Sequence, residues 1–174
     1  SARSDLASVI EAYGATVLIG ASGQGGAFGE DVVRAMSRSS EQPTILPMSN
    51  PTSISEAVPE DVLRWSDNKA LVATGSPFEP VQTTNGRQII GQANNVFVFP
   101  GIGLGTIVSE AREITDAMIS ASALTLARCL NESDIGSRRL IPDVSRLWDV
   151  CGEVALAVAM QAVDDGVAGE SMSE

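Results

Sequence analysis

The stretch ATVLIGASGQGGAFGEDVVRAMSR, residues 15–38, passes from one secondary-structure pattern to another. Residues 15–19 are apolar and rich in β-branched side chains, which predicts a strand buried on both faces, as in a parallel sheet. Residues 20–26 are rich in glycine, and residues 27–38 then place apolar side chains on one helical stripe. Strand, glycine loop and helix in this order predict a unit of an α/β fold.

The same alternation continues on both sides of this unit. Further strands are expected at residues 44–48, 70–74 and 96–99. Further helices are expected at residues 5–13, 106–111, 116–130 and 144–165. This order predicts the α/β class, with a partial doubly wound (Rossmann-like) parallel sheet that carries helices on both faces. In such a sheet, ligands bind at the carboxyl ends of the strands.

Short local signals predict where elements begin and turn. Ser53 and Glu56 form the S-x-x-E pattern of a capping box, and Pro59 suits the first turn of a helix that runs to Trp65. Asn85-Gly86, between extended residues, predicts a β-hairpin turn. Helix caps are expected at Gly14, Thr115 and Gly166.

Composition excludes several classes of function. The chain has 174 residues, a net charge of −11 and no histidine. Because Lys and Arg form no cluster with aromatic residues, we expect no binding to nucleic acid. Without histidine, the commonest metal ligand and the usual proton-transfer side chain near neutral pH, we expect neither a zinc site nor a Ser-His-Asp triad within this chain.

The cysteines and the polar tail bear on compartment and domain organisation. Cys129 and Cys151 fall on apolar faces of expected helices, which predicts buried free thiols and a reducing compartment, the cytoplasm. No apolar run approaches the roughly 18 residues of a membrane span. We expect one domain, or part of one, over residues 1–168, followed by a polar tail at residues 169–174.

The glycine loop has two interpretations. Gly23, Gly25 and Gly29 give G-x-G-x-x-x-G between a strand and a helix, where backbone N–H groups can face phosphate. The dinucleotide fingerprint is instead G-x-G-x-x-G, with an acidic residue at the end of the next strand. Here that strand ends in Met48-Ser49-Asn50. The favoured interpretation is a tight turn that touches a cofactor elsewhere than at its pyrophosphate.

Side-chain amides gather at expected strand ends. Asn50 follows one strand, and Asn94 and Asn95 precede another. Amides both donate and accept hydrogen bonds, so they suit a ligand that presents carboxylate oxygens and a hydroxyl together. The alternative is structural: Asn50 can form an Asx turn before Pro51, and the other two can cap backbone groups. Spacing alone favours the structural alternative.

Four blocks of sequence favour ligand binding by these asparagines over the structural alternative. Residues 18–22, 47–53, 73–78 and 91–105 resemble successive blocks of the malic enzyme family, in order and with similar spacing. The resemblance implies that Asn50, Asn94 and Asn95 lie at the malate and nicotinamide end of the cleft. It also implies that the dinucleotide is lined by a second set of residues. These are Ala21, Ser22, Gly23, Ser49 and Asn50.

The resemblance further implies NAD or NADP as cofactor, malate and pyruvate as ligands, and a divalent metal (Mg or Mn) in a parent enzyme. The family's catalytic tyrosine and lysine, its metal ligands and its phosphate-binding fingerprint correspond to sequence upstream of residue 1. Tyr13 and Lys69, the only residues of their types, match no catalytic motif. We therefore expect no catalytic residue and no metal ligand in this chain, and no activity from the chain alone.

Alternatives remain at the level of the parent protein. The blocks suit malolactic enzymes nearly as well, although Gly75-Ser-Pro-Phe78 favours malic enzymes. A free-standing ligand-binding or interaction module with the same fold is a second alternative. If half of a doubly wound sheet is missing, an exposed edge strand and apolar surface should also drive self-association, so we expect a homo-oligomer.

Overall fold

The computed structural model describes residues 5–84 and 86–169. Asn85 of the expected hairpin turn and residues 170–174 of the expected tail lie outside the described residues. The chain divides into two compact units, and each is described by itself. The first comprises Ser1–Ala93 with Ile135–Leu140, and the second comprises Asn94–Asp134 with Ile141–Glu174.

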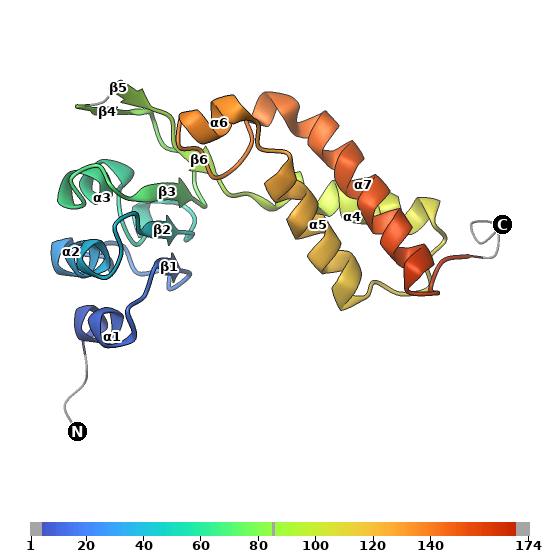
Figure 1. Cartoon of the computed structure of the whole chain (residues 1–174), viewed down its shortest axis with the longest axis horizontal. Helices are drawn as coiled ribbons and strands as arrows, with labels where there is room; N and C mark the ends of the chain where they lie inside the picture. Colours follow the sequence, from blue (N-terminus) through green and yellow to red (C-terminus); the bar gives the residue numbers. More distant parts are fainter. Residues whose placement is uncertain (1–4, 85, 170–174) are drawn as a thin grey trace. The chain divides into compact units, whose positions relative to one another are not determined.

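The first unit alternates helices and strands. Its main elements are α1 (Leu6–Tyr13), β1 (Val17–Gly20), α2 (Glu30–Ser39), β2 (Thr44–Pro47), η1 (Thr52–Ile54), α3 (Pro59–Trp65), β3 (Leu71–Thr74), β4 (Val81–Thr83), β5 (Gly86–Gln88) and β6 (Gly91–Gln92). Strands β1, β2, β3 and β6 form one parallel sheet in that order, and β4 pairs with β5 as an antiparallel hairpin. The predicted α/β class with a parallel sheet flanked by helices is confirmed, and within this unit the helices lie on one face of the sheet rather than on both (Figure 1).

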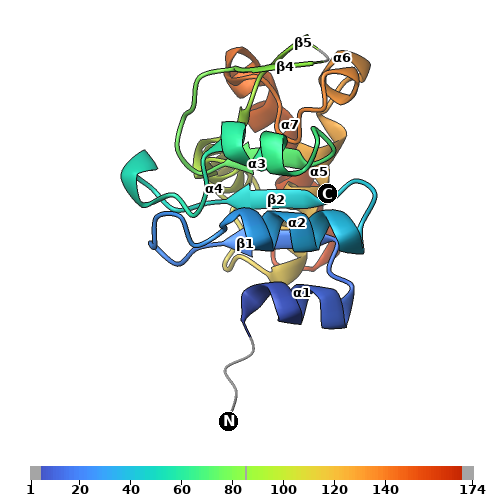
Figure 2. The ribbon, with the colours of Figure 1, turned by 90° about the vertical axis from the view of Figure 1, so that its left-hand side faces the viewer.

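Helices α1, α2 and α3 lie along one face of this sheet (Figures 1 and 2). Right-handed crossovers explain this for α2 and α3, because strands that follow one another in sequence and in space place their connecting helices on the same side. Leu18, Ile45 and Val72 are paired across the three strands and contribute to the core that these helices cover. Val33 and Met36 of α2 are fully buried in it.

Strand β1 forms one edge of the sheet and is covered on one face. Leu18 packs against the core, but Val17 and Ile19, on the opposite face, are 52% and 64% exposed. The expectation that this strand is buried on both faces is therefore wrong for the structure described. An apolar run records which residues can be buried, but the neighbouring elements decide which face is covered.

The expected strand at residues 96–99 is also wrong. The chain forms a short 3-10 helix there, η2 (Asn95–Phe97), and then α4 (Phe99–Val108). The fourth parallel strand lies just upstream, at β6, where Ala73 pairs with Gly91. A short apolar run does not distinguish a strand from a buried helical turn. Here Asn94 accepts a hydrogen bond from the N–H of Val96 and starts the turn, and Pro100 occupies the first turn of α4.

The second unit is helical. Besides η2 and α4 it contains α5 (Asp116–Arg128), η3 (Val144–Arg146) and α7 (Leu147–Asp164), and α6 (Glu132–Gly136) begins in it. Helix α7 contacts both α4 and α5. Close packing depends on small residues, because a Cβ at Gly101 of α4 would lie 2.6 Å from a methyl group of Val154. The predicted cap at Thr115 is confirmed by a hydrogen bond from the N–H of Met118.

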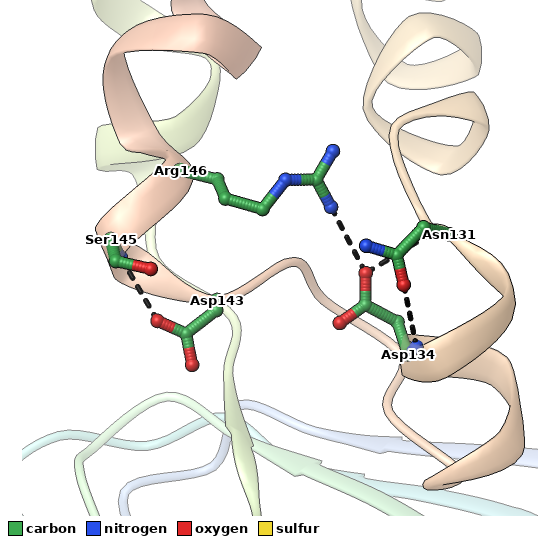
Figure 3. Close-up of polar contacts among 5 residues, drawn as sticks. All are labelled: Asn131, Asp134, Asp143, Ser145 and Arg146. Atoms are coloured by element: carbon green, nitrogen blue, oxygen red, sulfur yellow. Dashed lines mark hydrogen bonds and ion pairs between the residues drawn. The ribbon is translucent and has the colours of Figure 1, made fainter.

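A polar cluster connects the start of α6 to the region before α7 (Figure 3). Asn131 and Asp134 exchange hydrogen bonds between side-chain oxygens and backbone N–H groups, at 2.8 and 3.1 Å. Arg146 adds an ion pair of 3.0 Å to the buried Asp134 carboxylate. Asp143 accepts from the N–H of Ser145 at the start of η3. These contacts cap helices within the second unit.

Among residues 5–84 and 86–169, no helix combines the length and apolar character needed to cross a membrane.

Candidate functional site

The carboxyl ends of β1, β2 and β3 meet at one edge of the parallel sheet. The N–H of Met48 bonds to the carbonyl of Gly20 at 2.8 Å, and the N–H of Gly75 bonds to the carbonyl of Pro47 at 3.1 Å. Gly75 passes so close to β2 that a Cβ there would lie 2.0 Å from the carbonyl oxygen of Met48. Backbone contacts therefore hold the three loops that follow these strands against one another.

A buried carboxylate lies beneath two of these loops. Glu56 has no exposed surface, and its Oε1 accepts from the N–H of Ser22 at 2.7 Å, from the Ser22 hydroxyl at 2.9 Å and from the Ser49 hydroxyl at 2.5 Å. Its Oε2 accepts from the N–H of Ser49 at 3.2 Å. These bonds connect the loop after β1 to the segment after β2.

The expected capping box of Ser53 and Glu56 is wrong. Ser53 lies in η1, and α3 begins at Pro59 after Val58, whose side chain makes no capping hydrogen bond. Pro59 does occupy the first turn, as predicted. Glu56 turns into the fold because serine donors from two other loops satisfy its oxygens better than a local N–H could.

Glu56 is ionised at neutral pH. Burial is the largest single influence and acts to raise the pKa of this carboxyl, but the hydrogen bonds from Ser49 and Ser22 together outweigh it. They lower the pKa from 4.5 to about 2. The site therefore contains a fixed negative charge directly under the loop after β1.

Four backbone N–H groups of the glycine loop are bonded within the protein. The N–H of Ser22 bonds to Glu56, that of Gly23 to the Ser49 hydroxyl at 2.9 Å, and that of Gln24 to the Ser22 hydroxyl at 3.2 Å. Gly26 donates to the carbonyl of Ser55. A phosphate cradle needs free N–H groups and no adjacent carboxylate. This geometry favours the tight-turn interpretation of the loop over the pyrophosphate-binding one.

Asn50 has an oriented side chain. Its Oδ1 accepts from the hydroxyl of Ser76 at 3.0 Å, and Ser76 is only 1% exposed. The carbonyl of Ser76 in turn accepts from the hydroxyl of Thr74 at 2.8 Å. Asn50 as a residue is exposed, so its side-chain amide can also donate a hydrogen bond outside the fold.

The candidate residues fall in both units. Within the first unit, the structure brings the segment Ala21–Gly23 together with Ser49 and Asn50 at the carboxyl edge. Asn94 and Asn95 belong to the second unit, where both are exposed. Asn94 caps η2 by accepting from the N–H of Val96, as the structural alternative expected, and Asn95 is the first residue of η2.

Two residues of this site were missed by reasoning from the sequence. Glu56 fitted a local capping pattern, and Ser76 lay inside a family block without an assigned role. Their partners are 34 positions away for Ser22 with Glu56 and 26 positions away for Asn50 with Ser76. No local pattern in the sequence carries contacts of that separation.

Comparison with a family model gives a match over most of the chain. Residues 1–163 match the model described as malic enzyme, NAD binding domain. The NAD-dependent malic enzyme of Sodalis glossinidius is 50% identical over 153 residues, which cover 88% of this chain and 27% of that protein. The NAD-dependent malic enzyme of Pseudomonas syringae pv. tomato is 46% identical over 170 residues, covering 97% of this chain and 30% of that protein.

Solved structures show the same similarity. The malic enzyme of Entamoeba histolytica superposes with a TM-score of 0.76 at 31% identity, covering 94% of this chain and 30% of that one. The malic enzyme of Pyrococcus horikoshii gives a TM-score of 0.71 at 30% identity, covering 94% and 33%. The chain thus spans 27% and 30% of the two curated relatives described above.

Proposed function

Because this chain belongs to the malic enzyme family, we propose that it is the C-terminal portion of the NAD(P)-binding domain of an enzyme that oxidises and decarboxylates malate to pyruvate. Residues 1–168 would form that portion, with residues 169–174 as a tail. The relatives' names support NAD over NADP as the hydride acceptor. The proposal rests above all on the exposed, oriented amide of Asn50 beside the Ala21–Gly23 loop.

The described residues fit a dinucleotide along its uncharged part. The small side chains of Ala21, Ser22 and Gly23 permit a ligand to approach the backbone, and the occupied N–H groups and Glu56 disfavour phosphate there. A bound nicotinamide cofactor would supply the acceptor for the hydride of malate C2. In this proposal the residues of this chain bind and orient the reactants, and Asn50, Asn94 and Asn95 each take part in malate binding.

We assign no divalent metal to the described part of this chain. Within residues 5–84 and 86–169, no three or more His, Cys, Asp or Glu side chains are grouped so as to hold a metal ion. We propose that the ligands of a catalytic Mg or Mn ion, together with the acid and base that exchange protons, come from other parts of the parent enzyme. The two free thiols, Cys129 and Cys151, support placing that enzyme in the cytoplasm.

The decisive experiment is an assay of the parent enzyme. Malate with NAD or NADP and Mn or Mg should give pyruvate and reduced cofactor, with NAD the better substrate. A malolactic enzyme would instead release lactate without net accumulation of reduced cofactor. Lactate as the product, or no consumption of malate with either cofactor, would refute the proposal.

The isolated chain is expected to bind NAD and NADP weakly. Four N–H groups of its glycine loop are already bonded within the protein, and Glu56 adds repulsion for phosphate. Calorimetry with the 174-residue chain should detect no binding at micromolar cofactor. A micromolar dissociation constant would restore the pyrophosphate interpretation of the loop, and would favour a free-standing binding module over a part of an enzyme.

Replacement of Ser76 by alanine should weaken malate binding more than dinucleotide binding. The change removes the hydrogen bond that orients the Asn50 amide, so KM for malate should rise about tenfold while KM for NAD changes much less. Ser66→Ala is the matched control, because Ser66 is equally buried in the same unit and bonds at the end of α3. If Ser76→Ala and Ser66→Ala change KM for malate equally, Ser76 does not orient the Asn50 amide for malate binding.

The 174-residue chain should self-associate, as expected of a homo-oligomeric family member. Strand β1 leaves an edge and the apolar side chains of Val17 and Ile19 exposed, and such surfaces seek partners. Light scattering should show species larger than a monomer, and Ile19→Lys should shift them toward the monomer because a charge blocks edge pairing. A monodisperse wild-type monomer at high concentration would contradict this expectation.

A further inference from the structure

The hydrogen bonds around Glu56 have a fixed direction. A carboxylate is an acceptor only, so both Ser22 and Ser49 must donate their hydroxyl protons toward it. With its proton committed to Glu56, the Ser49 oxygen turns its lone pairs to the N–H of Gly23. Glu56, Ser49 and Gly23 therefore form a chain whose polarity the carboxylate sets.

The surrounding backbone is shaped to admit this carboxylate. Gly20, the last residue of β1, has no side chain where a Cβ would lie 2.7 Å from Cγ of Glu56. The carbonyl of Glu56 accepts from the N–H of Phe28 at 2.9 Å, which anchors the residue to the far end of the same loop. The carboxylate is thus enclosed between the loop it orders and the strand that precedes that loop.

The two sides of the site have separate supports. Glu56 bonds directly to Ser22 and to Ser49, and the Ser49 hydroxyl bonds to Gly23. We assign Ser22, Gly23 and Ser49 to the dinucleotide. The Asn50 side-chain amide, which donates to malate in the proposed function, is oriented by the Ser76 hydroxyl at 3.0 Å. The same hydroxyl lies 3.4 Å from the backbone carbonyl of Ser49, a longer contact that does not involve the Ser49 side chain. A change at one support should therefore affect one ligand more than the other.

We propose that Glu56 is the positioning residue of the cofactor side, holding the Ser22–Gly23 loop and Ser49 in the conformation that receives the dinucleotide. This inference rests on the proposed function, because it concerns the same site. Glu56 touches no reactant in this scheme, and it acts through Ser22 and Ser49.

The test is Glu56→Gln in the parent enzyme. Glutamine keeps the volume and one acceptor oxygen, but its amide nitrogen faces the N–H of Ser49, so one donor loses its acceptor. KM for NAD should rise about tenfold or more, and KM for malate should change much less. Ser76→Ala should show the opposite split. Glu56→Gln should thus raise mainly KM for NAD, and Ser76→Ala mainly KM for malate. A general loss of stability would not affect the two KM values in opposite ways in the two variants.

Ser55→Ala provides the matched control. Ser55 is the buried neighbour of Glu56, and its hydroxyl bonds to the carbonyl of Ala57 at 3.0 Å. Its contact with the glycine loop is made by its backbone carbonyl, which alanine keeps. The control should lower the melting temperature and leave both KM values unchanged. If Glu56→Gln behaves in the same way, with reduced stability and a normal KM for NAD, Glu56 is a structural residue only and the proposal is overturned.

A second pair of variants keeps the test decisive if Glu56→Gln fails to fold. Ser49→Ala and Ser22→Ala each leave the carboxylate in place and remove one side-chain donor to it. Both should raise KM for NAD and leave KM for malate nearly unchanged, and normal values for both variants would overturn the proposal. A wild-type parent that does not oxidise malate refutes the proposed function, whereas an active parent with unaffected variants refutes only the role of Glu56.

Discussion

Replacing Gly75 by alanine should destabilise the 174-residue chain by about 3 kcal/mol. The new Cβ would lie 2.0 Å from the carbonyl oxygen and 2.7 Å from the carbonyl carbon of Met48, and neither backbone atom can rotate away. The loops after β2 and β3 would have to separate, which would break the hydrogen bond from Gly75 to Pro47. Urea unfolding measures the loss of stability directly.

Gly152→Ala is the control for this steric argument. Gly152 lies within α7, and nothing stands within 4 Å of where its Cβ would be. Alanine there should stabilise the helix by up to about 1 kcal/mol, because glycine is the poorer helix former. We therefore expect Gly75→Ala to lower the free energy of unfolding and Gly152→Ala to raise it. A Gly75→Ala chain as stable as wild type would show that the β2 and β3 loops do not approach as closely as described.

Replacing Asn50 by alanine in the parent enzyme should reduce malate binding or turnover with malate by about tenfold to hundredfold. The change removes a hydrogen bond from an amide to a charged ligand, a loss of roughly 1.5–3 kcal/mol. Asn50 is exposed, and its contact with Ser76 is a minor part of the fold, so the melting temperature should change little. Asn95→Ala should behave similarly. Steady-state kinetics and thermal melts of the same preparations measure both quantities.

Asn131→Ala is the control for a residue that caps a helix and has no proposed contact with malate. Asn131 accepts from the N–H of Asp134 and caps α6, so its loss should cost about 1 kcal/mol of stability. It should leave the kinetic constants for malate unchanged. If the Asn50 and Asn95 variants instead resemble the Asn131 variant, with lower stability and a normal KM for malate, then both are turn or cap residues and their assignment to the substrate is wrong.

Local chemistry predicted much of the chain's secondary structure. Gly14 ends α1 with a φ of 60°, and Gly166 follows α7 with a φ of 66°, as expected of residues that take left-handed conformations at helix ends. Thr115 caps α5. Three of the four expected strands were correctly predicted from short apolar runs, because alternation with glycine loops and helices is itself a local pattern. Prediction was wrong at residues 96–99, where the same kind of run forms a helical turn.

The candidate site, like the fold, was predicted from the sequence only in part. The sequence alone determined that the chain is an α/β protein, and its four blocks carried the resemblance that picked out Ser49, Asn50 and the loop at residues 21–23. Only the tertiary structure decided that Glu56 is buried beneath that loop and that Ser76 orients Asn50. It also decided which face of β1 is covered. The reason is physical: caps and turns form between residues a few positions apart, whereas burial and these hydrogen bonds exist only after parallel strands bring distant loops to one edge.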